Sequence, residues 1–209
     1  MPEFRSSPSI DRRLKFADHE ESIEFAVFSA DGSRLLTVLN TEKAVVWNDQ
    51  DGAMLQVLPP VSCLGRPGMG RIQSAALDAR GRLAVLGLND GSARLIATQN
   101  GTELARLHVG LPQYPPSRDD GQRAMWDVAD ERPAGAEAVC FSGDGQLIAV
   151  GHSRRTVSVW EATGPQLLAT LSPRLDDDVA AAGLWAHDEP ISAVSFSRDN
   201  RYLFAGSDD

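Results

Sequence analysis

The sequence predicts an all-β fold built from repeats of a four-stranded antiparallel unit, with about three complete units and part of a fourth. Three observations predict it. Four segments of ten residues align without a gap and share apolar columns, and each is followed by a second apolar run. No convincing helical periodicity separates these runs. The repeated unit therefore consists of short strands joined by tight turns.

The aligned segments carry the first strand of each unit. They are Ile23–Gly32, Ile72–Gly81, Ala136–Gly145 and Ile191–Asn200. Their first, fourth and sixth positions are apolar in all four segments, and their last position is Gly or Asn. Because Gly and Asn readily take a left-handed backbone conformation, this pattern predicts a strand that enters a tight hairpin.

Further apolar runs predict the other strands of each unit. Second strands are expected at 35–39, 83–88, 147–151 and 202–206. Third and fourth strands are expected in three of the units, at 44–47 and 55–58, at 93–96 and 104–107, and at 157–160 and 167–171. A four-stranded antiparallel unit that repeats along the chain is the blade of a β-propeller.

Short motifs recur at fixed places in these units. Gly143-Asp144-Gly145 lies in the turn between the first and second strands of one unit. Asn89-Asp90-Gly91-Ser92 lies in the turn after the second strand of another unit. His19 and His187 each stand nine residues before the last apolar position of a first strand. These motifs resemble the WD-repeat propeller family, whose repeat has a Gly-His ahead of the first strand and a Trp-Asp that ends the third.

In the WD-repeat family, a His, a Ser or Thr, an Asp and a Trp commonly form a buried hydrogen-bonded set within a blade. The resemblance gives this structural role to His19, Thr37, Trp47, Asp90, Trp160, His187 and Asp209. No unit has all four residue types, and the Trp-Asp dipeptide is degraded to Trp47-Asn48 and Trp160-Glu161. We therefore expect partial polar sets, with apolar packing supplying more of the stability.

The units divide residues 1–209 into one partial propeller. The expected segments are a fourth strand of a preceding or closing blade at 12–17, blade 1 at 19–58, blade 2 at 70–108, a loop insertion at 109–135, blade 3 at 136–171, a second insertion at 172–186, and the first half of blade 4 at 187–209. A seven-blade ring needs roughly 280 to 315 residues at this repeat length. We therefore expect an incomplete ring and a fragment of a longer protein, with the remaining blades in the same longer chain or in another chain.

The two insertions, together with a shorter connection at 59–70, join a fourth strand to the first strand of the next blade. All three should emerge on one face, where repeat proteins commonly build their binding surface. Because Tyr, Trp and Arg most often anchor interfaces, the candidate partner-binding residues are Tyr114, Arg118, Arg123, Trp126 and Trp185. The alternative, that these aromatic side chains only cover blade edges, stays open.

Composition narrows the class of partner. Twenty Lys and Arg against 29 Asp and Glu give a net charge of −9, which is the wrong sign for binding a phosphate backbone. We therefore expect no nucleic-acid partner. No secretory signal and no run of roughly 18 apolar residues is present, so we expect no membrane partner. Cys63 and Cys140 lie far apart and fit two reduced thiols in the cytoplasm.

No residue pattern predicts catalysis, a cofactor or a metal. His152 ends a second strand and is interpreted as a surface or turn histidine. Asp176-Asp177-Asp178 lacks the loop of a calcium site, and the glycines at 65–70 lack the order of a phosphate-binding loop. The resemblance implies a non-enzymatic scaffold that binds proteins through the top face and inter-blade loops. The alternative is a propeller enzyme, or a propeller that binds a carbohydrate or another small ligand.

Overall fold

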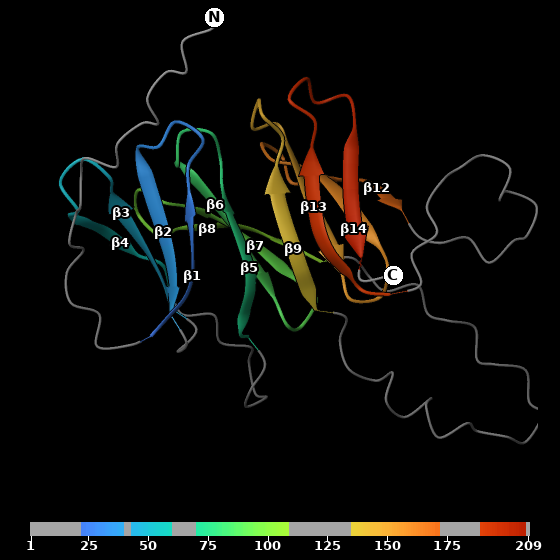
Figure 1. Ribbon diagram of the computed structural model, residues 1–209, viewed down its shortest axis with the longest axis horizontal. Helices are drawn as coiled ribbons and strands as arrows, with labels where there is room; N and C mark the ends of the chain where they lie inside the picture. The colour runs from blue at the N-terminus through green and yellow to red at the C-terminus, as the bar shows by residue number, and fades with distance from the viewer. Residues whose placement is uncertain (1–21, 40–42, 60–69, 109–134, 172–188, 208–209) are drawn as a thin grey trace, which may run out of the picture.

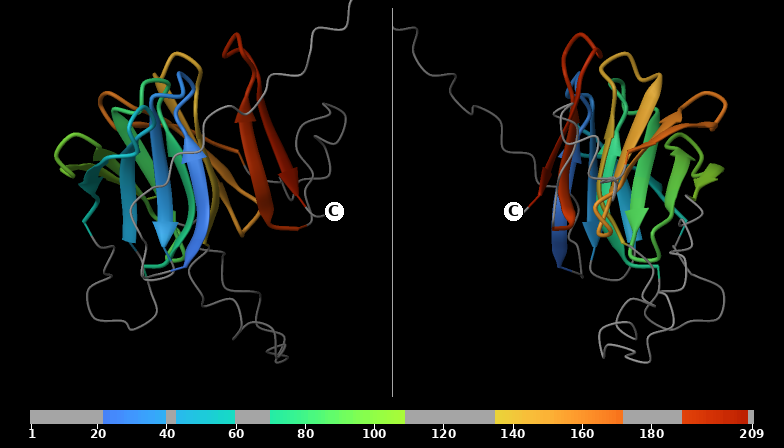
Figure 2. Two further views of the ribbon diagram at one scale, coloured as in Figure 1. Left: turned by 60° about the vertical axis from the view of Figure 1, so that its left-hand side comes forward. Right: turned by 90° about the vertical axis from the view of Figure 1, so that its right-hand side faces the viewer.

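The computed structural model describes residues 22–39, 43–59, 70–108, 135–171 and 189–207 (Figure 1). These residues form fourteen β-strands in four antiparallel sheets, and no helix occurs among them. Three sheets have four strands, and the fourth has two. The predicted all-β fold of three complete propeller blades and part of another is confirmed. The sheets follow one another in chain order as an open arc (Figure 2).

Each four-stranded sheet is a meander in which strands adjacent in sequence pair with each other. The first sheet consists of β1 (Ile23–Phe28), β2 (Arg34–Leu39), β3 (Lys43–Asn48) and β4 (Met54–Val57). The second consists of β5 (Ile72–Leu77), β6 (Leu83–Leu88), β7 (Ala93–Ala97) and β8 (Glu103–Leu107). The third consists of β9 (Ala136–Phe141), β10 (Leu147–His152), β11 (Val157–Glu161) and β12 (Leu167–Leu171). The fourth pairs β13 (Ile191–Phe196) with β14 (Leu203–Ser207).

The hairpin between the first and second strands has the turn chemistry that the sequence predicts. The last residue of the turn has a positive φ, which is 71° at Gly32 and 58° at Asn200. At the first of these turns, the Ser29 hydroxyl donates to Oδ1 of Asp31 at 2.7 Å, and the backbone N–H of Ser33 donates to the same oxygen. The Ser33 N–H and then the Ser29 hydroxyl hold the pKa of Asp31 below its usual range. The turn is therefore fixed by its own side chains.

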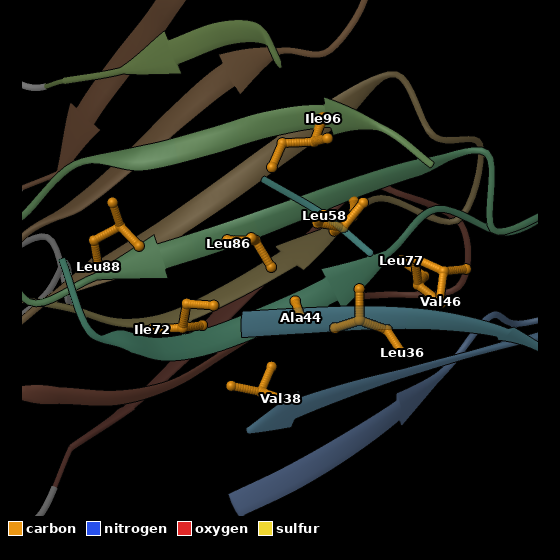
Figure 3. Packing of buried hydrophobic residues seen from close by; sticks show 11 residues of the cluster. Leu36, Val38, Ala44, Val46, Leu58, Ile72, Leu77, Leu86, Leu88 and Ile96 are labelled. Atoms are coloured by element: carbon orange, nitrogen blue, oxygen red, sulfur yellow. The ribbon is translucent and has the colours of Figure 1, made fainter. Parts of the chain in front are cut away.

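The core lies between consecutive sheets. Between the first and second sheets, buried aliphatic side chains of β2 and β3, such as Leu36 and Val46, pack against Ile72 of β5 and Leu86 of β6 (Figure 3). A corresponding cluster joins the second and third sheets, and it includes Trp160. Each of the first three sheets therefore buries one face against the sheet that follows it in the chain.

Two glycines allow close approach between sheets. A Cβ atom at Gly87 of β6 would lie 2.6 Å from the carbonyl oxygen of Ala136 in the next sheet. A Cβ atom at Gly151, the corresponding residue of β10, would lie 2.6 Å from Cγ2 of Ile191. Both distances are shorter than van der Waals contact, so the second strand can carry no side chain at these positions without a shift of the neighbouring sheet.

Candidate functional site

A β-bulge lies at the second residue of every first strand. In each pairing of first and second strand the register shifts across this residue, which has no partner of its own on the second strand. We call the four bulged residues the bulge row: Glu24, Gln73, Glu137 and Ser192. All four are polar, and none is buried. Bulges commonly re-aim side chains beside functional sites.

Polar contacts along the bulge row connect the first three sheets. Nη2 of Arg71 lies 2.9 Å from Oε1 of Glu24 and joins the first two sheets. Nε2 of Gln73 donates to Oε1 of Glu137 at 3.2 Å and joins the second and third sheets. The first strands β1, β5, β9 and β13 lie side by side along the arc (Figure 1). The bulge row therefore follows one end of these strands as a polar rim, and these contacts join its first three sheets.

The connections that enter the first strands are held at this same end. Asn89, in the turn after β6, accepts the backbone N–H of Gly70 at 2.7 Å and that of Arg71 at 3.1 Å through Oδ1. Its own backbone N–H donates to the Arg71 carbonyl at 3.0 Å. In the next sheet, the backbone N–H of Ser153 donates to the carbonyl of Gly135 at 2.9 Å. The last residues of both connections are thus fixed by the neighbouring turn.

The candidate partner-binding residues predicted from the sequence lie outside the described residues. They are Tyr114, Arg118, Arg123, Trp126 and Trp185. In chain order the first four belong to the connection that enters β9, and the fifth belongs to the connection that enters β13. Sequence reasoning missed the bulge row itself, although the signal was present as a polar second position in each aligned segment.

The residues assigned to blade-stiffening polar sets lie partly within the described residues. In the first sheet, Nε1 of Trp47 donates to Oγ1 of Thr37 at 2.9 Å, and both side chains are buried. In the second sheet, Asp90 accepts the hydroxyl of Ser92 at 2.6 Å within its own turn. The remaining assigned residues apart from Trp160 lie outside the described residues, and they are His19, His187 and Asp209.

The third sheet has a buried polar set of which the motif comparison indicated only Trp160. Nε1 of Trp160 donates to Oγ of Ser158 at 3.0 Å, and Nε2 of His152 lies 3.0 Å from the same oxygen. His152 begins the turn after β10, where its carbonyl accepts the backbone N–H of Arg155, but its interpretation as a surface histidine is wrong because its side chain is buried within the sheet stack. Burial, and secondly repulsion by the charge on His108, lowers the pKa of His152 to about 4.

The second sheet has an ion pair at a third-strand position where the other two four-stranded sheets have no charged residue. Arg94 of β7 is buried, and its Nη1 lies 3.1 Å from Oε2 of Glu103 on β8. Nε of Arg106 lies 3.7 Å from the other oxygen of the same carboxylate. Arg94 shares a sheet with Ile96, which stands where the other sheets have Trp. The apolar residues around Arg94 in β7 gave no signal of its partner.

Other kinds of site were sought among the described residues. No group of three or more His, Cys, Asp and Glu side chains there could hold a metal ion. No helix of that part of the chain is long and apolar enough to cross a membrane. Cys140 is a free thiol, and burial raises its pKa to about 11, so it is not a reactive thiolate.

Comparison with known proteins agrees with this architecture. The family model described as "WD domain, G-beta repeat" matches residues 134–161 and 181–209. The chain is also 28% identical over 171 residues to telomerase protein component 1 of Rattus norvegicus. That match covers 71% of this chain and 6% of the relative. Two segments of the chain therefore match WD40 repeats, and the resemblance predicted from its turn and tryptophan motifs is confirmed. WD40 repeats in general support protein–protein interaction.

Proposed function

We propose that the chain is a non-enzymatic scaffold that binds a protein partner at the end of the arc where the first strands begin. The observation that carries this proposal is the bulge row, which places one polar side chain that is exposed or half-buried from each sheet at that end. The three longest connections of the chain enter the sheets beside it. A partner could therefore contact several sheets at once.

The charge of the bulge row indicates which partner surface it fits. Glu24 and Glu137 contribute two carboxylates, whereas Arg71 neutralises one of them and Gln73 carries no charge. The whole chain has a net charge of −9. Electrostatic complementarity therefore favours a partner segment that presents Lys or Arg. A nucleic acid would be repelled by the same charge.

Preorganisation supports binding through the connections as well. Because Asn89 and Ser153 hold the ends of two connections, part of the ordering cost of a partner interface is met before binding. Within those connections we propose that the aromatic and arginine side chains named above contact the partner, with Tyr114 and Trp126 as the main anchors. We place this interaction in the cytoplasm.

Charge reversal tests the proposed face. The test variant carries Glu24→Lys and Glu137→Lys at the bulge row. The matched control carries Asp51→Lys and Glu161→Lys, which make the same change of charge where third strands turn into fourth strands, at the other end of the sheets. Both variants and the parent chain are immobilised, and the proteins they capture from cells that express the chain are quantified by mass spectrometry.

The proposal predicts that the parent and the control capture a common protein and that the bulge-row variant captures at least tenfold less of it. Equal capture by all three chains would contradict binding at the bulge row. Far-ultraviolet circular dichroism of each variant verifies that the sheets are intact. Replacing Tyr114 and Trp126 by Ala then tests the connection separately, since it leaves the bulge row unchanged.

A further inference from the structure

The two carboxylates of the bulge row differ in how their charge is compensated. Glu24 forms an ion pair with Nη2 of Arg71 at 2.9 Å. Glu137 instead accepts a hydrogen bond from the uncharged amide of Gln73, with 3.2 Å between Nε2 and Oε1. Within the described ranges, no Lys or Arg forms an ion pair with Glu137. Among these residues, the uncompensated charge of the bulge row is therefore that of Glu137.

Glu137 lies at the junction of the second and third sheets. It is the second residue of β9 and is half-buried, and its two neighbours in the chain are buried. The attraction between a partly buried carboxylate and an opposite charge is screened less than that of an exposed pair. A basic group that a partner brings to this junction therefore gains more at Glu137 than it would at a fully exposed carboxylate.

The backbone that carries Glu137 is held from two sides. Across the interface, the Ser74 hydroxyl donates to the carbonyl of Ala136 at 2.7 Å. From its own sheet, the backbone N–H of Ser153 donates to the carbonyl of Gly135 at 2.9 Å. Both bonds exist without a partner, so binding at this position requires little further ordering of the chain.

Gln73 holds the side chain of Glu137 as well. While its Nε2 donates to Oε1 of Glu137, its own Oε1 lies against Gly135. A Cβ atom at Gly135 would overlap this amide oxygen and would lie 2.6 Å from Oε1 of Glu137. Glycine thus leaves the space in which the two side chains meet. Oε2 of Glu137 accepts no hydrogen bond from the described part of the chain.

We propose that Glu137 is the anchor of the bulge row, where Oε2 binds a basic side chain of the protein partner, and that Gln73 is the positioning residue that orients this carboxylate. The inference rests on the proposed binding face and names the contact within it. Hydrogen bonds between a carboxylate and an ammonium or guanidinium group are among the strongest that side chains form. Glu24 is unsuited to the same role because Arg71 already supplies its counter-charge.

The variant Gln73→Lys tests the anchor while leaving Glu137 in place. It puts an ammonium group beside Glu137 on an unbranched side chain, which repeats the pairing of Arg71 with Glu24. Stability should be unchanged or higher, whereas a basic group from outside should lose its site. The matched control is Gln99→Lys, which makes the same change of charge at an exposed position in the turn between β7 and β8, at the other end of the second sheet.

The probe is a library of short random peptides, selected on the immobilised parent chain and then synthesised for titration. The selected peptides should share Lys or Arg at one position, and parallel Lys and Arg versions show which cation binds more tightly. Gln73→Lys should lower their affinity at least tenfold, and Gln99→Lys should leave it unchanged. Replacing the basic peptide residue by norleucine should cause the same loss on the parent chain and no further loss on Gln73→Lys.

Two more variants separate positioning from charge. Gln73→Met removes the amide without adding a charge, and it should weaken binding by less than Gln73→Lys does. Arg71→Gln gives Glu24 an amide neighbour in place of its ion pair, so selection on this variant should recover peptides with a second basic position. A general loss of structure would not produce this gain.

The outcomes distinguish this inference from the proposed binding face. Peptides that lose affinity for the Glu24→Lys and Glu137→Lys double variant but bind Gln73→Lys as tightly as the parent would overturn the inference and leave the binding face standing. Peptides that no bulge-row variant affects, or a selection that recovers none, would overturn both. Thermal unfolding verifies that Gln73→Lys is folded, and the norleucine peptides test the same contact on the unmodified chain.

Discussion

Thr37 and Ser158 accept the same kind of hydrogen bond from a third-strand tryptophan, although they lie on different strands of their sheets. In the first sheet Thr37 pairs across the strands with Val45, and its hydroxyl accepts the indole N–H of the third-strand tryptophan. In the third sheet the corresponding pair is Val150 and Ser158, and the hydroxyl that accepts the indole lies on the third strand instead. The fold therefore retains a buried hydroxyl beside the indole, while the strand that supplies it changes.

Removing the Ser158 hydroxyl should destabilise the chain. In Ser158→Ala the buried indole N–H of Trp160 and the imidazole of His152 both lose their partner. An unsatisfied buried polar group costs about 1 to 3 kcal/mol, so the free energy of unfolding should fall by at least that amount. Urea denaturation measures it. Ser195→Ala, at an exposed serine, is the control and should change stability by less than about 0.5 kcal/mol.

Moving the hydroxyl back to the second strand should restore part of that loss. Val150→Thr in the Ser158→Ala background places a hydroxyl where Thr37 has one in the first sheet. If the indole is the group that needs an acceptor, the double variant is more stable than Ser158→Ala alone. A double variant of equal or lower stability would mean that the strand position matters and not only the hydroxyl.

His152 should make stability depend on pH between 6.5 and 4. Its folded pKa is about 4 against an ordinary value of 6.5, because burial disfavours the imidazolium. The unfolded state therefore binds the proton first as the pH falls. The stabilisation is complete above pH 6.5 and is lost as the pH decreases toward 4, by about 3 kcal/mol over the whole window. His152→Gln should flatten this part of a stability profile measured by urea denaturation, and an unchanged slope would refute the assignment.

A methyl group at Gly151 should be far less tolerated than one at Gly164. A Cβ atom at Gly151 meets Ile191 at 2.6 Å, whereas at Gly164 the nearest atom is 3.9 Å away. Gly151→Ala must separate the third and fourth sheets and should cost about 1 to 3 kcal/mol. Thermal unfolding should show a clear decrease for Gly151→Ala and almost none for Gly164→Ala. Equal melting temperatures would show that the sheets do not approach as closely as described.

The two partners of the Arg94–Glu103 ion pair should respond differently to replacement. Arg94→Met keeps an unbranched chain in the buried site and leaves Glu103 with access to water, so it should be close to neutral. Glu103→Gln leaves the buried guanidinium without its counter-charge and should cost about 1 to 3 kcal/mol. Denaturant titrations of the two variants test this asymmetry, and an equal loss from both would contradict it.

The sequence predicted the sheets because local pattern determines them. Alternating apolar positions and left-handed turn residues, such as Gly32 and Asn200, place each first strand and hairpin without reference to the rest of the chain. The same columns turned out to form the interfaces between sheets. Their role was not predicted, because which face a strand buries depends on the neighbouring sheet.

The polar groups were harder to predict. His152 was misinterpreted because it follows Gly151 at the end of a strand, and only the packing of adjacent sheets buries it. Ser158 was missed because the motif comparison placed the hydroxyl on the second strand, where Thr37 lies. The bulge row depends on a register shift that residue alternation alone does not reveal. The aromatic residues of the long connections remain predictions.

Hydrogen exchange with and without the captured partner tests the binding face most directly. The account predicts that the partner slows exchange at the starts of β5 and β9, around Arg71 and Glu137, where the connections enter the sheets. It predicts no change at the opposite end, in the turn around Asp51 between β3 and β4. Protection confined to that turn, with none at the bulge row, would contradict the central claim.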